Sequence, residues 1–301
     1  MNIAGVQSFW FKAARGPKTL LAVFAHPDDE SFGPGGTLAR YAAEGVDVHY
    51  ACATRGEVGA VNAELMQRFA TVGDLRWSEL AAATKILGLT GLHWLGYRDS
   101  GMPGSDDNRH PDALLQADQD VLIGRIVALI RALRPQVVMT FDSRGGYGHP
   151  DHISIHYATE RAFAIAGDAA QYPEQIAQGL APFAPQKLYY TAFPKGFLKF
   201  AVAVLKLLGR DPARFGRNQD INLAEIAMWE QQITTRIATG RYLDIKQKAG
   251  ECHKSQTGPS GMFGWMPGPV RRWILGVETF TRAQPPVKGN VRLEADLFEG
   301  M

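Results

Sequence analysis

The chain has 301 residues, of which 46% are hydrophobic. This length and composition fit one large globular domain, or one domain with a small appendage, and exclude a disordered or fibrous protein. Its 32 Lys plus Arg residues nearly balance its 30 Asp plus Glu residues, and the net charge of +2 argues against nucleic acid or an anionic membrane as the main partner and favours a small molecule.

Strands and helices are expected to alternate along the first two thirds of the chain. This order predicts a doubly wound, Rossmann-like three-layer α/β sandwich with a mostly parallel sheet over residues 1–195. Apolar runs typical of buried parallel strands occur at 20–25, 48–54, 92–97, 136–141 and 187–193. Apolar side chains at helical spacing predict helices over 37–43, 74–87, 117–133 and 150–166.

The remaining residues, 196–301, follow a different pattern. Helices are expected over 223–238 and 241–254, and a Gly/Pro-rich stretch follows at 255–269. We expect this part to pack on the core as a smaller helical and loop cap, so that the whole chain forms one structural unit.

Cysteine content and hydropathy indicate a cytoplasmic protein without stable membrane insertion. Cys52 and Cys252 lack CxxC spacing, so neither a disulfide scaffold nor a cysteine metal site is predicted. The first 16 residues have no long apolar core followed by a cleavage site. The most hydrophobic later run, 197–208, is interrupted by two lysines, and we interpret it as a half-buried amphipathic helix rather than one lying on a membrane. The sequence leaves open whether the protein forms a homo-oligomer.

Ionisable side chains follow four of the predicted strands. The stretch HPDDE (26–30) follows the first strand, TRGE (54–57) the second, YRDSGM (97–102) the third and DSRGGYGHPDH (142–152) the fourth. Ligands of open α/β sheets bind at the carboxyl ends of the strands, so the four stretches are expected to share one functional edge.

The acidic stretch after the first strand predicts a cation site, because three adjacent acids repel one another and are costly to bury. His26 and Asp29 are three residues apart, as are His149 and His152. Two imidazoles and one carboxylate, with a fourth position left to water, are typical of a catalytic zinc site. The remaining acid, Asp28, is then interpreted as the proton acceptor for the attacking water.

At these residues the sequence resembles the PIG-L, or LmbE-like, family of zinc-dependent N-acetylglucosaminyl de-N-acetylases. The motif AHPDDE after a first strand, together with GHPDH after a later one, is a specific pair. The resemblance covers residues 19 to about 166, with shorter similarities at 253–256 and 278–283.

The resemblance implies a role for each residue of the two motifs. It implies a Zn²⁺ ion, or another divalent metal such as Fe²⁺, with three protein ligands, a general base, and a residue that stabilises or protonates the tetrahedral intermediate. These are His26, Asp29 and His152 as ligands, Asp28 as the base, and His149 as the residue at the intermediate.

Within that family the sequence is most similar to the branch of mycothiol-pathway deacetylases that act on N-acetylglucosaminyl-inositol. The branch pattern includes the arginine of TRGE, the aspartate of YRDSGM and a tyrosine before GHPDH, here Arg55, Asp99 and Tyr147. Arg55 and Asp99 are expected to bind sugar hydroxyls, and Tyr147 to donate to the amide oxygen. The last third matches any one branch only loosely, so the group attached to the sugar stays open.

Several alternatives remain at the level of the sequence. His156 lies one helical turn from His152 and is the rival ligand, although a histidine deeper in the helix more often belongs to the core or the surface. We expect a zinc-dependent hydrolase of carbon–nitrogen bonds that removes the acetyl group of an N-acetylated sugar or glycoside. The alternatives are an amidase for a larger acyl group, as in thiol-conjugate amidases resembling the same family, and a catalytically silent sugar-binding module.

Overall fold

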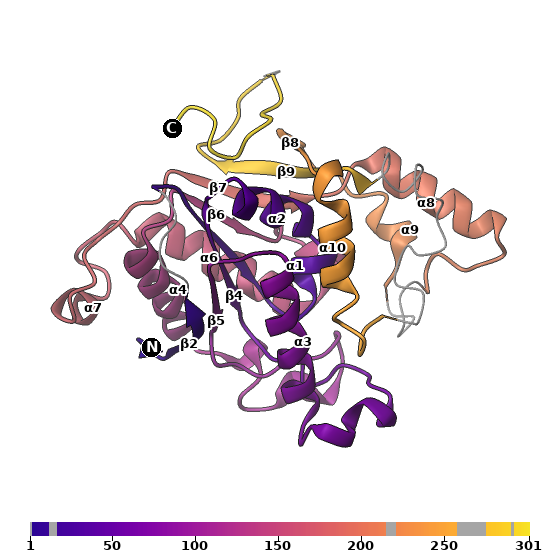
Figure 1. Ribbon diagram of the computed structural model, residues 1–301, viewed down its shortest axis with the longest axis horizontal. Coiled ribbons are helices and arrows are strands. Elements are labelled where there is room, and N and C mark those ends of the chain that lie inside the picture. The colour runs from indigo at the N-terminus through magenta and orange to yellow at the C-terminus, as the bar shows by residue number, and fades with distance from the viewer. Residues whose placement is uncertain (1, 12–16, 215–220, 258–274, 290–291) are drawn as a thin grey trace.

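One mixed sheet forms the centre of the protein (Figure 1). The computed structural model describes residues 2–11, 17–214, 221–257, 275–289 and 292–301. The strands within these residues are β1 (Asn2–Ile3), β2 (Val6–Phe11), β3 (Thr19–Phe24), β4 (Asp47–Cys52), β5 (Gly91–Trp94), β6 (Val137–Thr140), β7 (Lys187–Ala192), β8 (Thr235–Ala238) and β9 (Val277–Gln284). Their order is β1-β2-β5-β4-β3-β6-β7-β9-β8.

Helices cover both faces of this sheet and complete three layers (Figure 1). They are α1 (Asp29–Phe32), α2 (Gly35–Ala43), α3 (Val72–Ile86), α4 (Gln119–Leu133), α5 (Gly145–Gly148), α6 (Pro150–Ile165), α7 (Pro173–Ala177), α8 (Lys195–Leu207), α9 (Leu223–Ile226) and α10 (Leu243–Gly250). Helix α10 contacts both α2 and α3, and α4 packs on α6.

The predicted Rossmann-like core is confirmed. The five strands expected from apolar runs are β5, β4, β3, β6 and β7, which pair in parallel in that order. The four expected helices are α2, α3, α4 and α6, and their ends lie within two residues of the predicted ones. All six residues of β4 are buried because helices cover both faces of the parallel sheet.

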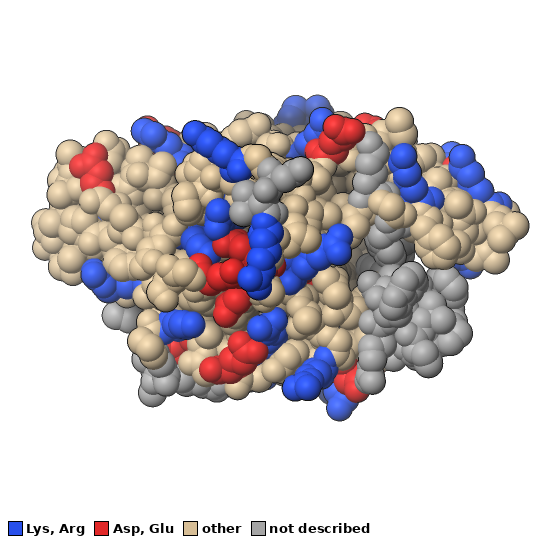
Figure 2. Space-filling model, turned by 90° about the horizontal axis from the view of Figure 1, so that it is seen from above, with Lys and Arg blue, Asp and Glu red and all other residues tan. Residues whose placement is uncertain are grey.

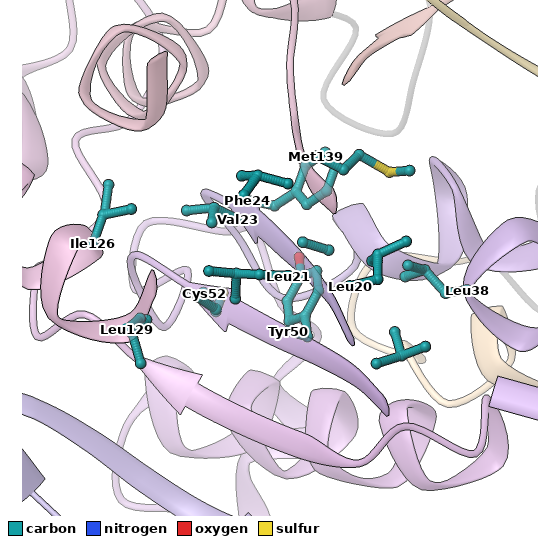
Figure 3. Close-up of a cluster of buried hydrophobic side chains, with 14 of the residues drawn as sticks. Leu20, Leu21, Val23, Phe24, Leu38, Tyr50, Cys52, Ile126, Leu129 and Met139 are labelled. Carbon is teal, nitrogen blue, oxygen red and sulfur yellow. The ribbon is translucent and has the colours of Figure 1, made fainter. Parts of the chain in front are cut away.

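A continuous hydrophobic core holds these strands in place (Figure 3). Leu20, Val23 and Phe24 of β3 are fully buried. The Phe24 ring packs edge-on against Phe141, with 4.7 Å between ring centres. Each buried side chain of this size contributes about 1.5–3 kcal/mol to stability. The carboxyl end of β3 is therefore a rigid support for His26, which follows two residues later.

The two ends of the sheet differ from the prediction. Residues 223–238 were expected to be one helix, but only α9 is helical, and 235–238 form β8. Thr235 and Ile237 are buried while the residues after each are exposed, and this period of two is a strand pattern. Strands β1 and β2 were not predicted; β2 pairs antiparallel with β5.

The other expectations for the C-terminal part have mixed outcomes. Helix α10 corresponds to the helix expected over 241–254. Most of the Gly/Pro-rich stretch 255–269 lies outside the described residues. Antiparallel pairing with β7 brings β9 into the core sheet. The division of the chain at residue 195 stays a prediction.

Helix α8 is the amphipathic helix predicted over 197–208. Its buried residue Leu198 packs with Val202 against Ile226 and Ala227, at and just after α9. Within the parts of the chain that the structure describes, no helix is both long enough and apolar enough to cross a bilayer.

Candidate metal-dependent active site

The structure brings most of the strand-end residues together at the carboxyl edge of the parallel strands. His26 follows β3, Asp99 follows β5, and GHPDH follows β6. His26 Nε2 lies 3.4 Å from Asp99 Oδ1 and 3.1 Å from Asp151 Oδ2, so motifs from three strands meet at one histidine.

His26 and His152 face each other at the centre of the site. His26 Nδ1 lies 3.0 Å from His152 Nε2. The other nitrogen of each ring already has an acceptor: His26 Nε2 contacts Asp151, and His152 Nδ1 lies 3.0 Å from the Gly145 carbonyl oxygen. An N–H directed at each of these acceptors leaves lone pairs on the two facing nitrogens. Facing lone pairs repel, so this arrangement requires a proton or a metal cation between the rings.

Asp29 places a carboxylate beside the two rings, although it belongs to neither group of possible ligand atoms found among the described residues. Its Oδ1 lies 3.6 Å from His152 Nε2, and its Oδ2 lies 3.9 Å from His26 Nδ1. Ligand atoms about 2 Å from one tetrahedral metal are about 3.4 Å apart, so the distance from Asp29 Oδ1 to His152 Nε2 suits a shared ion, while the approach to His26 uses the other carboxylate oxygen. Burial raises the pKa of Asp29 to about 7, and a cation bound beside it would favour the ionised form.

Asp28 occupies a strained backbone position next to the histidine cluster. Its φ of 120° is rare for a residue with a side chain, and such strain is concentrated at functional sites. Its backbone N–H donates to Glu30 Oε2 at 3.0 Å, and its carboxylate accepts from Arg76 at 3.2 Å. Burial raises the pKa of Asp28, while Arg76 opposes that rise. A carboxylate of raised pKa is a better proton acceptor.

His149 caps α6 and lies beside the two facing imidazoles. Its ring centre is 4.5 Å from that of His26 and 5.0 Å from that of His152. Its Nδ1 accepts the backbone N–H of Asp151, so Nε2 carries the ring proton. Burial, together with the neighbouring His26, lowers the pKa of His149 to about 4. The neutral ring can donate an N–H to an oxyanion at ordinary pH.

The ligand atoms also allow other combinations. One nitrogen each of His26, His149 and His152 lies within 4.8 Å of the others. The same limit holds for ligand atoms of a second group, which is His26, Asp99, His149 and Asp151. The site can therefore hold a divalent metal, and the described geometry permits more than one set of ligands.

Asp99 and Asp151 are buried side chains that contact His26. Burial alone would raise the pKa of Asp99, but the close contact with His26 lowers it well below its usual value. Asp151 Oδ2 also accepts the Ser100 N–H at 2.9 Å, and its buried Oδ1 has no hydrogen-bond partner among the described residues. Asp151 lies inside GHPDH but was not predicted as a site residue.

Arg55 packs among aromatic rings in the structure. Its guanidinium lies 4.1 Å from the ring centre of Trp94, 5.6 Å from that of Trp77 and 5.8 Å from that of Phe9. It also pairs with Asp74 at 3.4 Å. These contacts are separate from the histidine cluster, and the sugar-binding role of Arg55 stays a prediction.

Arg76 is the arginine that contacts the site, and the sequence analysis did not single it out. It is 4% exposed and donates to the carbonyl oxygens of Gly56 and Pro27 at 2.9 and 2.8 Å, in addition to Asp28. From the sequence alone, a charged residue in the middle of α3 is expected to face solvent. The available signal was a second charged residue on the same helix face, Glu79, which is also buried.

A buried pair from the C-terminal part supports the Asp28 loop. Glu30 Oε1 lies 2.6 Å from His253 Nε2, and both side chains are completely buried. The same carboxylate accepts the Asp28 N–H through its other oxygen. Two residues further on, Ser255 Oγ donates to Glu79 at 2.5 Å. Residues 253–255 therefore connect the C-terminal part to the loop that carries Asp28.

The rival ligand His156 is directed elsewhere. Its Nδ1 lies 2.8 Å from the Phe141 carbonyl oxygen, and its ring packs edge-on against Tyr190 at 4.7 Å. It is absent from both groups of ligand atoms found among the described residues. His156 thus has the contacts of a core histidine.

Tyr147 forms the boundary between the cluster and an adjoining hollow. Its ring centre is 4.9 Å from that of His152 and 6.1 Å from that of His149. The hollow beside it has a volume of about 450 Å³, and its walls include Asn222, Glu225 and Trp229. This mixture of polar and aromatic walls is suited to a hydroxylated ligand.

Sequence comparison connects these residues to a known family. The PIG-L family, described as GlcNAc-PI de-N-acetylase, matches residues 21–163. A 1D-myo-inositol 2-acetamido-2-deoxy-α-D-glucopyranoside deacetylase from Thermobifida fusca is 37% identical, over 93% of this chain and 99% of its own length. A protein of the same name from Acidothermus cellulolyticus is 37% identical, over 94% of this chain and 95% of its own.

Solved structures share the fold at lower sequence identity. The N,N'-diacetylchitobiose deacetylase from Pyrococcus horikoshii has a TM-score of 0.60 at 20% identity, covering 91% of this chain and 87% of its own. The 4-carboxy-2-hydroxymuconate hydratase from Pseudomonas putida has a TM-score of 0.59 at 21% identity, covering 91% of this chain and 100% of its own. Because these two neighbours are named for different reactions, the fold alone does not define the chemistry.

Proposed function

This chain belongs to the PIG-L family of GlcNAc-PI de-N-acetylases, and we propose how its buried histidine and aspartate cluster removes the acetyl group of an N-acetylglucosamine-type substrate. The observation that carries the proposal is the 3.0 Å approach of His26 Nδ1 to His152 Nε2, with Asp29 alongside. We assign the three metal-ligand positions to these residues and propose zinc as the metal, since zinc binds imidazole and carboxylate ligands.

The metal and the protein have separate tasks in this mechanism. A bound divalent ion would act as a Lewis acid toward the amide carbonyl and would lower the pKa of water. Asp28 takes the proton of the attacking water, which its raised pKa favours. Arg76 holds the Asp28 carboxylate in position, and Glu30 accepts the backbone N–H of Asp28.

His149 completes the step as a hydrogen-bond donor. Its Nδ1 is occupied by the Asp151 N–H, so its Nε2–H is available to the oxyanion that forms when water attacks the carbonyl. Its pKa of about 4 supports a neutral donor rather than a proton-transferring acid. Tyr147 is proposed as a second donor at the same oxygen, and the proton taken by Asp28 then passes to the departing amine.

The substrate is proposed to be N-acetylglucosamine in glycosidic linkage to inositol. Relatives bearing that substrate in their names match almost the whole chain, including the part beyond the family motifs. Asp99 is proposed to accept a sugar hydroxyl beside His26, which it contacts, and Arg55 is proposed as a more distant contact from the sequence pattern alone. The hollow lined by Tyr147 and Trp229 would receive the inositol ring.

A substrate panel tests this function directly. The purified, metal-loaded protein should release free amine from N-acetylglucosaminyl-inositol, and a chelator should abolish release until zinc is restored. Inclusion of N-acetylglucosamine, N,N'-diacetylchitobiose and a glucosaminide with a larger acyl group separates the acetyl-specific enzyme from the amidase alternative. Binding of these sugars without amine release would instead identify a silent sugar-binding module.

A further inference from the structure

Helix α8 exposes a second apolar face away from the protein. Its inner face carries Leu198 and Val202, which pack on α9. On its outer face and at its end, Phe200 is 56% exposed, Leu207 is 86% exposed and Leu208 is 59% exposed. Phe200 and Leu207 are seven residues apart and therefore lie on the same side of the helix. An ordinary surface helix has polar side chains at such positions.

Cations accompany these exposed apolar side chains. Lys199, Lys206 and Arg210 are exposed, and the sequence from 195 to 210 contains no Asp or Glu; the first acid is Asp211. In Figure 2 the lobe at the right-hand end, where Figure 1 places α8, shows Lys and Arg side chains and no acidic ones on the visible face. The positive charge is therefore local, in a chain whose net charge is only +2.

The sequence favoured a half-buried helix here rather than one lying on a membrane. The exposed outer face of α8 changes that interpretation, and we propose that it binds an anionic lipid surface, with the helix lying in the plane of the membrane. Phe200, Leu207 and Leu208 would enter the boundary between headgroups and acyl chains, and Lys199, Lys206 and Arg210 would contact lipid phosphates. The combination of aromatic and aliphatic side chains with nearby cations is typical of interfacial helices. A length of 13 residues, about 20 Å, is too short to span a bilayer.

Charge distinguishes a lipid surface from a protein partner. Positive charge next to an apolar strip matches the negative potential of a membrane containing acidic lipids. A second copy of this chain would bring the same cations together, and like charges facing each other are unfavourable. This proposal does not depend on the deacetylase activity, because none of the α8 side chains that it uses belongs to the buried histidine and aspartate cluster.

Vesicle co-sedimentation of the full-length, metal-loaded protein tests the proposal. The protein should pellet with vesicles of phosphatidylcholine and phosphatidylglycerol, stay in solution with phosphatidylcholine alone, and lose binding as salt rises. The double variant Phe200→Gln/Leu207→Gln should bind at least tenfold more weakly. Lys199→Gln/Lys206→Gln should also lose at least tenfold, since each cation near an anionic surface contributes about fivefold.

Matched control variants separate vesicle binding by the outer face of α8 from nonspecific binding. Ile86→Gln removes a side chain that is 40% exposed on α3, and Lys85→Gln removes a neighbouring cation, so both should bind vesicles like the parent. Deacetylation of a soluble substrate should be unchanged in every variant, which shows that the fold is intact.

Three results would overturn the proposal. The first is a parent protein that stays in solution with anionic vesicles. The second is binding that the α8 variants leave unchanged. The third is a dimer in solution that Leu207→Gln dissociates, which would make this face a contact between two copies of the chain.

Discussion

His26 Nδ1 and His152 Nε2 lie 3.0 Å apart, and each ring directs its other nitrogen at a fixed acceptor. Those acceptors, a carboxylate and a backbone carbonyl, are the partners that metal-ligating histidines have in many proteins. Burial alone would lower the pKa of His26, but Asp99, Asp151 and Asp29 outweigh it and raise the pKa well above its usual value. The cluster thus attracts positive charge.

The first prediction concerns the metal. Elemental analysis at neutral pH should find about one zinc or substitute divalent ion per chain, and His152→Ala should lose it. His156→Gln, one helical turn away, should retain it because His156 contacts the Phe141 carbonyl instead. Metal content should fall below about pH 6, where imidazoles become protonated. A parent protein with no metal and no metal-stimulated activity would disprove the assignment.

The second prediction distinguishes the two arginines. Arg76→Ala removes the positive charge that lowers the pKa of Asp28, so the acidic limb of the pH–kcat/KM profile should move to higher pH. It should also destabilise the fold by about 3–5 kcal/mol, because a buried carboxylate loses its partner. Arg55→Ala should leave the acidic limb of the pH–kcat/KM profile at the same pH, since Arg55 pairs with Asp74 rather than with Asp28. Equal pH profiles for parent and Arg76→Ala would exclude this role.

The third prediction concerns sugar recognition by Asp99. Asp99→Ala removes both acceptor oxygens, and an unmatched sugar hydroxyl should cost about 1–3 kcal/mol, or about 10- to 100-fold in kcat/KM. Because Asp99 also contacts His26, metal content must be measured on the same samples. Retained metal with lost kcat/KM supports the sugar contact. Parental activity on N-acetylglucosaminides would refute it.

The sequence could predict those parts of the molecule that depend on local patterns. Continuous apolar runs identify the parallel strands, and the motif after β3 places His26 and Asp29 on one turn. Arg76 could not be found in this way, because its partner Asp28 is 48 residues distant in the sequence. The strand β8 was missed because it has only four residues and its pairing with β9 is non-local.

The fourth prediction concerns stability in acid. Burial lowers the pKa of His49 to about 4 and, together with His49, that of His93 to about 3. The unfolded chain has histidine pKa values near 6.5, so below that pH it binds protons that the native state does not, and stability falls as pH drops toward 4. At pH 5 the loss should be about 2 kcal/mol per histidine.

Urea denaturation at pH 7 and pH 5 measures this loss. The double variant His49→Gln/His93→Gln should show a pH dependence smaller by about 4 kcal/mol, whatever its stability at pH 7. Because the metal site is the same in both proteins, its contribution cancels in the comparison. An identical pH dependence would show that these two imidazoles are not neutral in the native state.

The fifth prediction separates Asp28 from Asp29, which are adjacent and carry the same charge. Asp29 lies 3.6 Å from His152 Nε2, so Asp29→Ala should lose metal. Asp28 contacts Arg76 rather than the facing imidazole nitrogens, so Asp28→Asn should keep metal and substrate affinity. The amide preserves the shape but cannot accept a proton, and loss of a general base costs about 10²- to 10⁴-fold in rate. Turnover of Asp28→Asn should therefore fall by at least about 100-fold at parental zinc content. An active Asp28→Asn, or an Asp29→Ala that holds zinc tightly, would mean that the two roles are reversed or that the site lies elsewhere.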